Sequence, residues 1–331
     1  MNNMQIAIRI LGVVIVGGLT VLGGALAFDK PIKPPPLASI FNPFADVDFG
    51  DLPPVQTYIA HDGTKLGFRT YQGGETQAIV LIHGSSDDGT GLHPLAKALR
   101  DAGATIFVPV IRGHGNSGQS GDINYIGELE DDLADLATVL RSRRPNASYT
   151  LIGFSAGGGF VLRVIGSPIG NMFERFIMIS PALPQDAPTN RPANGGWISL
   201  AWPRIVALAI LNAIGVDWFN GLPIVAFATS PVAPNLTAFY SYRLAINFGA
   251  PANYLSVLRH SPNSTALLMG GADELFFSDR FASLIATARP DLKVTIVPGV
   301  NHVGMTASPD GISAVSKKFL EMTMGGDRRP R

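Results

Sequence analysis

One serine in this chain stands among residues that have little or no side chain. The segment L-I-G-F-S-A-G-G-G-F spans residues 151 to 160, and Ser155 has Gly153 two residues before it and Gly157 two after it. In the pattern G-x-S-x-G a serine occupies a sharp turn between a strand and a helix, where its hydroxyl is exposed to attack a carbonyl carbon. The pattern therefore makes Ser155 a candidate nucleophile.

Other readings of the glycines fit less well. A nucleotide-binding loop of the form G-x-x-x-x-G-K-[ST] would start at Gly153, but Gly159 stands where the lysine is required. A dinucleotide-binding pattern G-x-G-x-x-G would start at Gly157, but it meets Leu162 at its last position. A flexible glycine and serine loop remains as the third reading, and the rest of the chain has to decide.

A serine hydroxyl is a poor nucleophile until a base accepts its proton and a third group orients that base. Of the six histidines, only His302 both follows the serine in the chain and lies in a glycine-punctuated loop, V-P-G-V-N-H-V-G, directly after the last predicted strand. The order serine, acid, histidine is typical of proteins that carry the G-x-S-x-G turn. His302 is therefore the candidate base.

The orienting acid is expected at the end of another strand. Asp273 closes the segment L-L-M-G-G-A-D, and Glu274 is a weaker candidate one residue further on. A purely structural reading of Asp273, as the cap of the following helix, is also open.

Acyl transfer needs hydrogen-bond donors aimed at the developing oxyanion. One donor should be the backbone N–H of Ala156, since the amides at the start of a helix have no acceptor within it. The second should come from the loop after I-V-L-I-H-G-S-S, with the N–H of Ser85 preferred and that of Ser86 as the near alternative.

Apolar strand candidates alternate with helix-length segments from residue 55 onward. Strand–helix alternation with nearly continuous apolar strands predicts a mostly parallel sheet with helices on both faces. The predicted strands are Val55–His61, Lys65–Tyr71, Ala78–His83, Thr105–Ile111, Tyr149–Phe154, Phe176–Ser180, Ala266–Gly270 and Lys293–Val297, and the clearest helix is Tyr125–Arg143. In such sheets ligands bind beyond the carboxyl ends of the strands, which is where the candidate residues lie.

The alternation is interrupted once. Residues 181–264 contain proline clusters and a long apolar stretch, and they predict a cap inserted between a first core part, residues 55–180, and a second, residues 265–325. The apolar excess fits ordinary packing inside the cap, and it would also fit an apolar substrate channel.

The amino-terminal region has a different character. The uncharged run from Ile10 to Phe28 is long enough to reach about 28 Å as a helix, so residues 1–28 predict a transmembrane anchor or a signal segment. Residues 29–54 hold seven prolines and predict a solvated linker, and residues 326–331 predict a disordered tail. This organisation implies a membrane-anchored protein with an extracytoplasmic catalytic domain, or a secreted or periplasmic one after signal cleavage.

Composition excludes several classes of function. Lys and Arg balance Asp and Glu at 25 each, so no overall field favours nucleic acid. The absence of cysteine excludes disulfides, thiolate metal sites and a cysteine nucleophile. No metal-ligand cluster or cofactor motif is visible, and none is expected.

Five segments in order resemble the α/β-hydrolase superfamily, and within it the lysophospholipase and monoacylglycerol-lipase-like branch. They are L-I-H-G-S-S, P-V-I-R-G-H-G-N-S-G, G-F-S-A-G-G, G-G-A-D-E-L-F and P-G-V-N-H-V-G, spread over roughly residues 55 to 322. The resemblance implies an eight-stranded sheet, a cap after the sixth strand, and Ser155, Asp273 and His302 as a catalytic triad. It also implies a mainly structural role for the loop Arg112–Gly115.

The sequence thus predicts a serine hydrolase that cleaves small-molecule or lipid esters with an apolar acyl group through an acyl-enzyme. Two alternatives stay open within the same fold: an amide or peptide hydrolase of the aminopeptidase kind, and a membrane-tethered binding protein without catalysis. Acyl transfer to an acceptor other than water is also compatible with the same residues.

Overall fold

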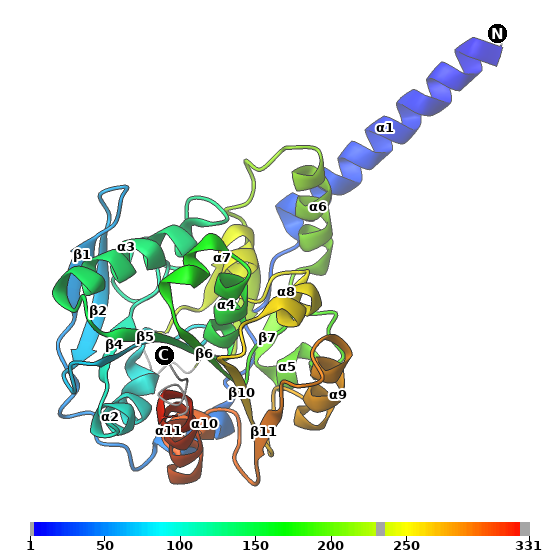
Figure 1. The fold of residues 1–331 in the computed structure, drawn as a ribbon. Coiled ribbons are helices and arrows are strands. Elements are labelled where there is room, and N and C mark those ends of the chain that lie inside the picture. The colour runs from blue at the N-terminus through cyan, green and yellow to red at the C-terminus, as the bar shows by residue number, and fades with distance from the viewer. Residues whose placement is uncertain (1–2, 230–235, 325–331) are drawn as a thin grey trace.

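The computed structural model describes residues 3–229 and 236–324 of the chain (Figure 1). Its centre is an eight-stranded sheet in the order β1-β2-β4-β3-β5-β6-β10-β11, in which β2 is antiparallel to both neighbours and the other adjacent pairs are parallel. The strands are β1 (Gln56–Ile59), β2 (Lys65–Tyr71), β3 (Gln77–Ile82), β4 (Thr105–Pro109), β5 (Ser148–Phe154), β6 (Arg175–Ile179), β10 (Thr265–Gly270) and β11 (Val294–Val297). The predicted mostly parallel, eight-stranded sheet is confirmed.

The sheet is buried because helices cover both of its faces. The helices of the core are α2 (His93–Asp101), α3 (Glu128–Arg143), α4 (Ala156–Ile165), α9 (Ser278–Ala288), α10 (Gly304–Ala307) and α11 (Pro309–Met324), with the 3₁₀ turns η2 (Thr90–Leu92) and η3 (Pro168–Met172). Helices α2 and α11 pack together below the sheet in Figure 1, and α3 and α4 lie above it. Strand β3, at the centre, has no solvent-exposed surface from Ala78 to Ile82. Strands covered in this way can be apolar at every position, which is why their runs were visible in the sequence.

The segment between β6 and β10 forms a second, smaller layer with its own sheet. It contains α5 (Ala193–Gly196), β7 (Ile198–Leu200), α6 (Trp202–Ala213), β8 (Pro223–Phe227), β9 (Phe239–Ser241), α7 (Tyr242–Asn247) and α8 (Tyr254–His260). The strands pair antiparallel in the order β7-β8-β9. We refer to this segment as the cap. Its small sheet was not predicted, since three-residue strands such as β7 and β9 are too short to show an alternation of apolar and polar residues.

The amino-terminal segment begins with α1 (Asn3–Phe28), which projects from the body of the molecule (Figure 1). Its carboxyl end lies beside α6, where the guanidinium of Arg204 donates a 2.8 Å hydrogen bond to the carbonyl of Leu26. Among the described residues, no helix combines the length and hydropathy that crossing a membrane requires. The predicted membrane anchor is therefore not supported by the structure.

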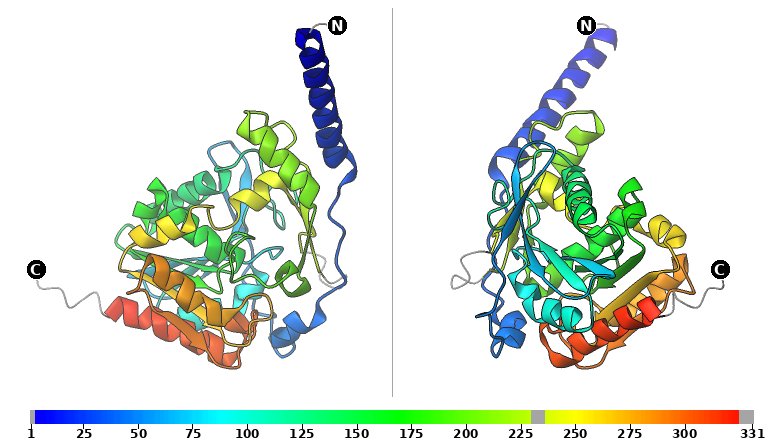
Figure 2. Two further views of the ribbon diagram at one scale, coloured as in Figure 1. Left: turned by 90° about the vertical axis from the view of Figure 1, so that its right-hand side faces the viewer. Right: turned by 60° about the vertical axis from the view of Figure 1, so that its left-hand side comes forward.

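Residues 29–54 do not behave as the solvated linker that their prolines predicted. After α1 the chain runs along the side of the body and forms the 3₁₀ helix η1 (Ala38–Phe44) (Figure 2). Ile40 in η1 is only 3% exposed and belongs to the main core. The proline content restricts this segment to an extended path, but the apolar residues Leu37, Ile40, Phe41 and Phe44 pack against the body. The predicted disordered tail, residues 326–331, lies outside the described residues.

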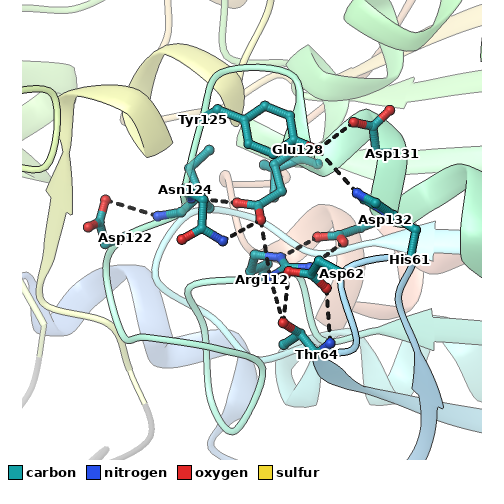
Figure 3. Close-up of polar contacts among 12 residues, drawn as sticks. His61, Asp62, Thr64, Arg112, Asp122, Asn124, Tyr125, Glu128, Asp131 and Asp132 are labelled. Carbon is teal, nitrogen blue, oxygen red and sulfur yellow. Dashed lines mark hydrogen bonds and ion pairs between the residues drawn. The ribbon is translucent and has the colours of Figure 1, made fainter. Parts of the chain in front are cut away.

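A cluster of charged side chains joins the β1–β2 hairpin to α3 (Figure 3). Arg112, just after β4, is 4% exposed and holds Asp132 through two hydrogen bonds of 2.7 and 2.8 Å. The same guanidinium lies 2.9 Å from Asp62 in the hairpin turn and 3.2 Å from Glu128 at the start of α3. Arg112 thus ties three segments of the chain together, which fits the structural role expected of its loop.

Candidate active site

Ser155 lies at a strained turn between β5 and α4. Its backbone has φ 54° and ψ −117°, a conformation that L residues rarely adopt, and its own N–H is tied to the carbonyl of Ile179 at 2.9 Å. The flanking glycines make the turn possible. A Cβ at Gly153 would come within 2.1 Å of the Gly157 carbonyl oxygen, and one at Gly157 within 2.4 Å of the His83 carbonyl oxygen. Both positions therefore require glycine.

The structure brings together the three residues that the sequence singled out. Nε2 of His302 lies 3.0 Å from Oγ of Ser155, and Nδ1 of His302 lies 2.7 Å from a carboxylate oxygen of Asp273. These residues come from the carboxyl ends of β5, β10 and β11, and each is at most 6% exposed. The chain of hydrogen bonds can take a proton from the serine hydroxyl onto an imidazole whose other nitrogen faces a carboxylate.

The surroundings of His302 fix its orientation. Its ring packs between the rings of Phe154 and Phe276, at centroid distances of 4.8 and 5.2 Å. Its backbone N–H donates a 2.8 Å hydrogen bond to Glu274, whose other oxygen accepts from Asn301 at 3.3 Å. Glu274, the weaker candidate for the acid, therefore holds the histidine loop rather than the imidazole.

Asp273 is oriented by the backbone that follows it. One carboxylate oxygen accepts hydrogen bonds from the N–H groups of Leu275 and Phe276 at 2.9 and 3.0 Å, and the other faces His302. The helix-cap reading is wrong: Asp273 closes the turn of residues 273–276, whereas α9 begins at Ser278 without a side-chain cap. The second carboxylate oxygen is left for the imidazole.

The other five histidines, all within the described residues, have partners elsewhere. His83 and His114 are fully buried, and burial lowers the pKa of both rings, so they stay neutral. His61 and His93 bind the carboxylates of Asp135 and Asp51, and His260 contacts the carbonyl of Ser256.

The geometry separates the two candidates for the second oxyanion donor. The N–H of Ser86 donates to the hydroxyl of Tyr240 at 2.7 Å, so it is already used. For the N–H of Ser85 we find no acceptor among the described residues, and Ser85 lies in the wall of both cavities that reach Ser155. Ala156 is the first residue of α4, and its N–H has no acceptor within the helix. Among the described residues, the N–H groups of Ser85 and Ala156 therefore both stay without an acceptor.

Tyr240 was missed by the sequence analysis. It comes from β9 in the cap, and its hydroxyl joins the Ser86 amide to Nε2 of His114 in the core. Nothing in its sequence context, F-Y-S, marks it, because the contacts span 126 and 154 residues of chain. A tyrosine whose hydroxyl links two distant loops can be found only in the folded structure.

Two cavities meet at Ser155. The larger, of about 340 Å³, lies under the cap and is lined mainly by apolar side chains from β7, β8 and α7, together with Trp202 of α6 and Phe276 of the loop after β10. The smaller, of about 80 Å³, lies on the other side of Trp197 and includes His302 in its wall. Asp87 lines the smaller cavity, and burial raises the pKa of its carboxyl group. The Ser155 hydroxyl thus lies between two mainly apolar spaces.

Comparison with known proteins agrees with the fold. Residues 74–220 match the family described as serine aminopeptidase, S33. A monoacylglycerol lipase of Mycolicibacterium smegmatis (strain ATCC 700084 / mc(2)155) is 26% identical over 106 residues, which are 32% of this chain and 38% of that protein. The matched part thus spans well under half of the curated relative.

Solved structures extend the likeness to nearly the whole fold. The monoacylglycerol lipase of Paleococcus ferrophilus superposes with a TM-score of 0.59 at 17% identity, over 78% of this chain and 99% of that one. A putative aryl esterase from Burkholderia cenocepacia gives 0.58 at 16% identity, over 82% and 100% of the two chains. At such low identity these structures establish the fold. The chain thus has the α/β-hydrolase fold, and its sequence resembles the monoacylglycerol-lipase-like branch of that superfamily.

Proposed function

We propose that this protein is a serine hydrolase that cleaves carboxylic esters with an apolar acyl group. One observation carries the proposal: the hydrogen-bonded chain from Ser155 through His302 to Asp273 ends at the junction of two mainly apolar cavities. A structural hydroxyl in the core would have no cavity beside it.

The mechanism follows from the positions of the groups. His302 accepts the proton of the Ser155 hydroxyl as Oγ attacks the ester carbonyl, and the carboxylate of Asp273 stabilises the imidazolium. The amides of Ser85 and Ala156 donate hydrogen bonds to the oxyanion of the tetrahedral intermediate. His302 then protonates the departing alcohol, which leaves an acyl-enzyme on Ser155. Water attacks this ester by the same route, and the acid and the free serine are regenerated.

The lining of the cavities favours esters over peptides with a free amino terminus. An ammonium group needs a carboxylate counter-ion when it leaves water. The large cavity has Arg163 in its wall and, among the described residues, neither Asp nor Glu. Among the described residues, the small cavity has one carboxyl group in its wall, that of Asp87, and burial raises the pKa of this group.

The first test is covalent labelling of the full chain by an alkyl fluorophosphonate, followed by hydrolysis of methyl esters of increasing acyl length measured by proton release. We expect stoichiometric labelling at Ser155 and a rate that rises with acyl length until the large cavity is filled. Ser155→Ala should abolish both. A folded wild-type protein that is neither labelled nor active on any ester would contradict the proposal and favour a non-catalytic binding role.

A further inference from the structure

The segment of residues 29–51, which we call the strap, crosses from the cap to the core beside Ser155. At its cap end the carboxylate of Asp29 accepts a 3.0 Å hydrogen bond from the backbone N–H of Arg204 in α6. Further along, the N–H of Leu37 donates to the carbonyl of Ala228, just after β8, at 3.3 Å. Two contacts with the cap thus fix the path of the first half of the strap.

The other end of the strap is held by the core. The two carboxylate oxygens of Asp51 lie 2.9 Å from Nε2 of His93 and 2.6 Å from Nζ of Lys97, both in α2. Phe49 packs on the ring of His93 at a centroid distance of 5.8 Å. Because both ends are held, residues 37–44 between them have a defined position over the site.

Residues 37–44 form one wall of the small cavity. Ile40, Phe41 and Phe44 line it, opposite Phe154 and His302. The ring of Phe41 meets Trp197 of the cap edge-on at 6.1 Å, so this side of the cavity is closed by an aromatic pair from two parts of the chain. At about 80 Å³ the cavity is roughly a quarter of the size of the one under the cap.

The position of His302 assigns the two cavities to the two halves of the ester. The departing alcohol takes its proton from Nε2 of His302, so it leaves on the side that this ring faces. His302 lines the small cavity and is not part of the wall of the large one. The alcohol group therefore lies in the small cavity, and the acyl chain lies under the cap.

We propose that Phe41 and Phe44 of the strap determine specificity by limiting the size of the alcohol group that the site accepts. The substrates are then esters of small alcohols with longer apolar acyl chains. This inference rests on the proposed ester hydrolysis. It assigns one wall of the alcohol-binding cavity to the strap, a segment outside the α/β core and the cap.

The test varies the alcohol and keeps the acyl group constant. Hexanoate esters of methanol, ethanol, 1-butanol and benzyl alcohol are hydrolysed by the full chain and by Phe41→Ala and Phe44→Ala. In the wild type we expect kcat/KM to fall as the alcohol grows. Each variant should raise the ratio of benzyl to methyl ester by about tenfold, the scale on which one or two extra methylenes are discriminated in an apolar pocket. The dependence on acyl length should stay as in the wild type.

Two variants control the experiment. Ile32→Ala changes an 80%-exposed residue of the same strap that lines neither cavity, and it should leave the alcohol profile unchanged. Phe41→Leu retains bulk and should shift the profile in the same direction by less, so an unfolded alanine variant would not block the test.

Fluorophosphonate labelling separates the two hypotheses, because its leaving group is a single fluorine atom. A wild type that is not labelled would refute the proposed hydrolysis itself. A labelled wild type with the same alcohol profile in Phe41→Ala and Phe44→Ala would overturn the role of the strap. A change in the acyl-length profile instead would also overturn it, because the small cavity would then hold the acyl group.

Discussion

Two buried polar networks lie at the carboxyl edge of the sheet, and they differ in what they leave open. The Arg112 cluster follows β4, and the network of Ser155, Asp273 and His302 follows β5, β10 and β11. In the cluster one guanidinium faces three carboxylates, so the charges are paired among themselves. In the other network the hydroxyl at the end of the chain faces two cavities, beside backbone amides that have no acceptor.

Under the proposed function, this difference separates a stabilising network from a reactive one. In the Arg112 cluster the hydrogen bonds all hold segments of the chain together. Removal of one partner leaves the other charged groups buried and unpaired. An open network holds its groups in place and keeps donors for a charge that appears only during the reaction. Variants should therefore act on stability in one network and on rate in the other.

Ser155→Ala should give the largest effect. We expect kcat to fall by about a millionfold, the loss typical of removing the serine from such a triad. The free energy of unfolding should change by less than about 1 kcal/mol, because the substitution leaves neither a large cavity nor a buried charge. Esterase assays with fluorophosphonate labelling and urea unfolding check the two halves of the prediction. Ser283→Ala, in the exposed face of α9, is the matched control.

A Ser155→Ala protein that kept its activity would place the nucleophile elsewhere. The contrast between the Arg112 cluster and the Ser155 network would then no longer hold. A protein that unfolded would show that the hydroxyl belongs to the stabilising kind of network.

Arg112→Met should give the opposite result. Removal of the guanidinium leaves Asp132 and Glu128 buried without their counter-ion, which costs about 3–5 kcal/mol of unfolding free energy. The rate of fluorophosphonate labelling per folded molecule should stay close to that of the wild type. Denaturant titrations, with labelling in the native baseline, measure both quantities. Loss of labelling at unchanged stability would contradict the division between the two networks.

Tyr240→Phe tests the contact between the two layers. Without the hydroxyl, the Ser86 amide and the His114 ring each lose a buried partner, at a cost of about 1–3 kcal/mol in stability. Because the Ser86 contact holds the loop that carries Ser85, we also expect kcat to fall by about tenfold while KM stays nearly constant. Phe239→Ala, in the same strand and exposed, is the control. Unchanged kcat would show that the loop of Ser85 and Ser86 keeps its position without the hydrogen bond to Tyr240.

The sequence predicted the reactive network better than the stabilising one. Ser155, Asp273 and His302 stand at the ends of apolar strands, and a parallel sheet brings such ends to one edge. The eight strands of the core were each predicted to within two residues, and the central ones stood out because their runs are nearly continuously apolar. Pattern and topology together placed the residues without any knowledge of side-chain contacts.

What the sequence did not predict depends on contacts between distant segments. The packing of η1 on the core is hidden by the prolines around it, which indicate an extended chain and say nothing of what the chain touches. The choice between the amides of Ser85 and Ser86 depends on Tyr240, more than 150 residues away. The small sheet of the cap has strands too short for a period to appear.

The smallest predicted effect concerns the exposed edge of the stabilising cluster. The hydrogen bond from the Arg112 guanidinium lowers the pKa of the Asp62 carboxyl group below its ordinary 3.8. The unfolded chain therefore binds a proton at this group more readily than the folded one. The stability that Asp62 contributes is present above about pH 4 and is lost as the pH falls through the lower folded value. Since 29% of the side chain is exposed, we expect less than about 1 kcal/mol.

Thermal unfolding of wild type and Asp62→Asn between pH 7 and pH 3 measures this contribution. The gap in melting temperature should be small at neutral pH and should begin to close below about pH 4, because the unfolded chain then binds a proton at this carboxyl group while the folded chain does not. Glu75→Gln, an exposed carboxylate in the loop before β3, controls for the change in net charge. A gap that widened with acid would mean that the pKa of Asp62 is raised rather than lowered. The cluster would then tolerate its third carboxylate only in the neutral form, and its charges would not be paired in the way that distinguishes it from the network at Ser155.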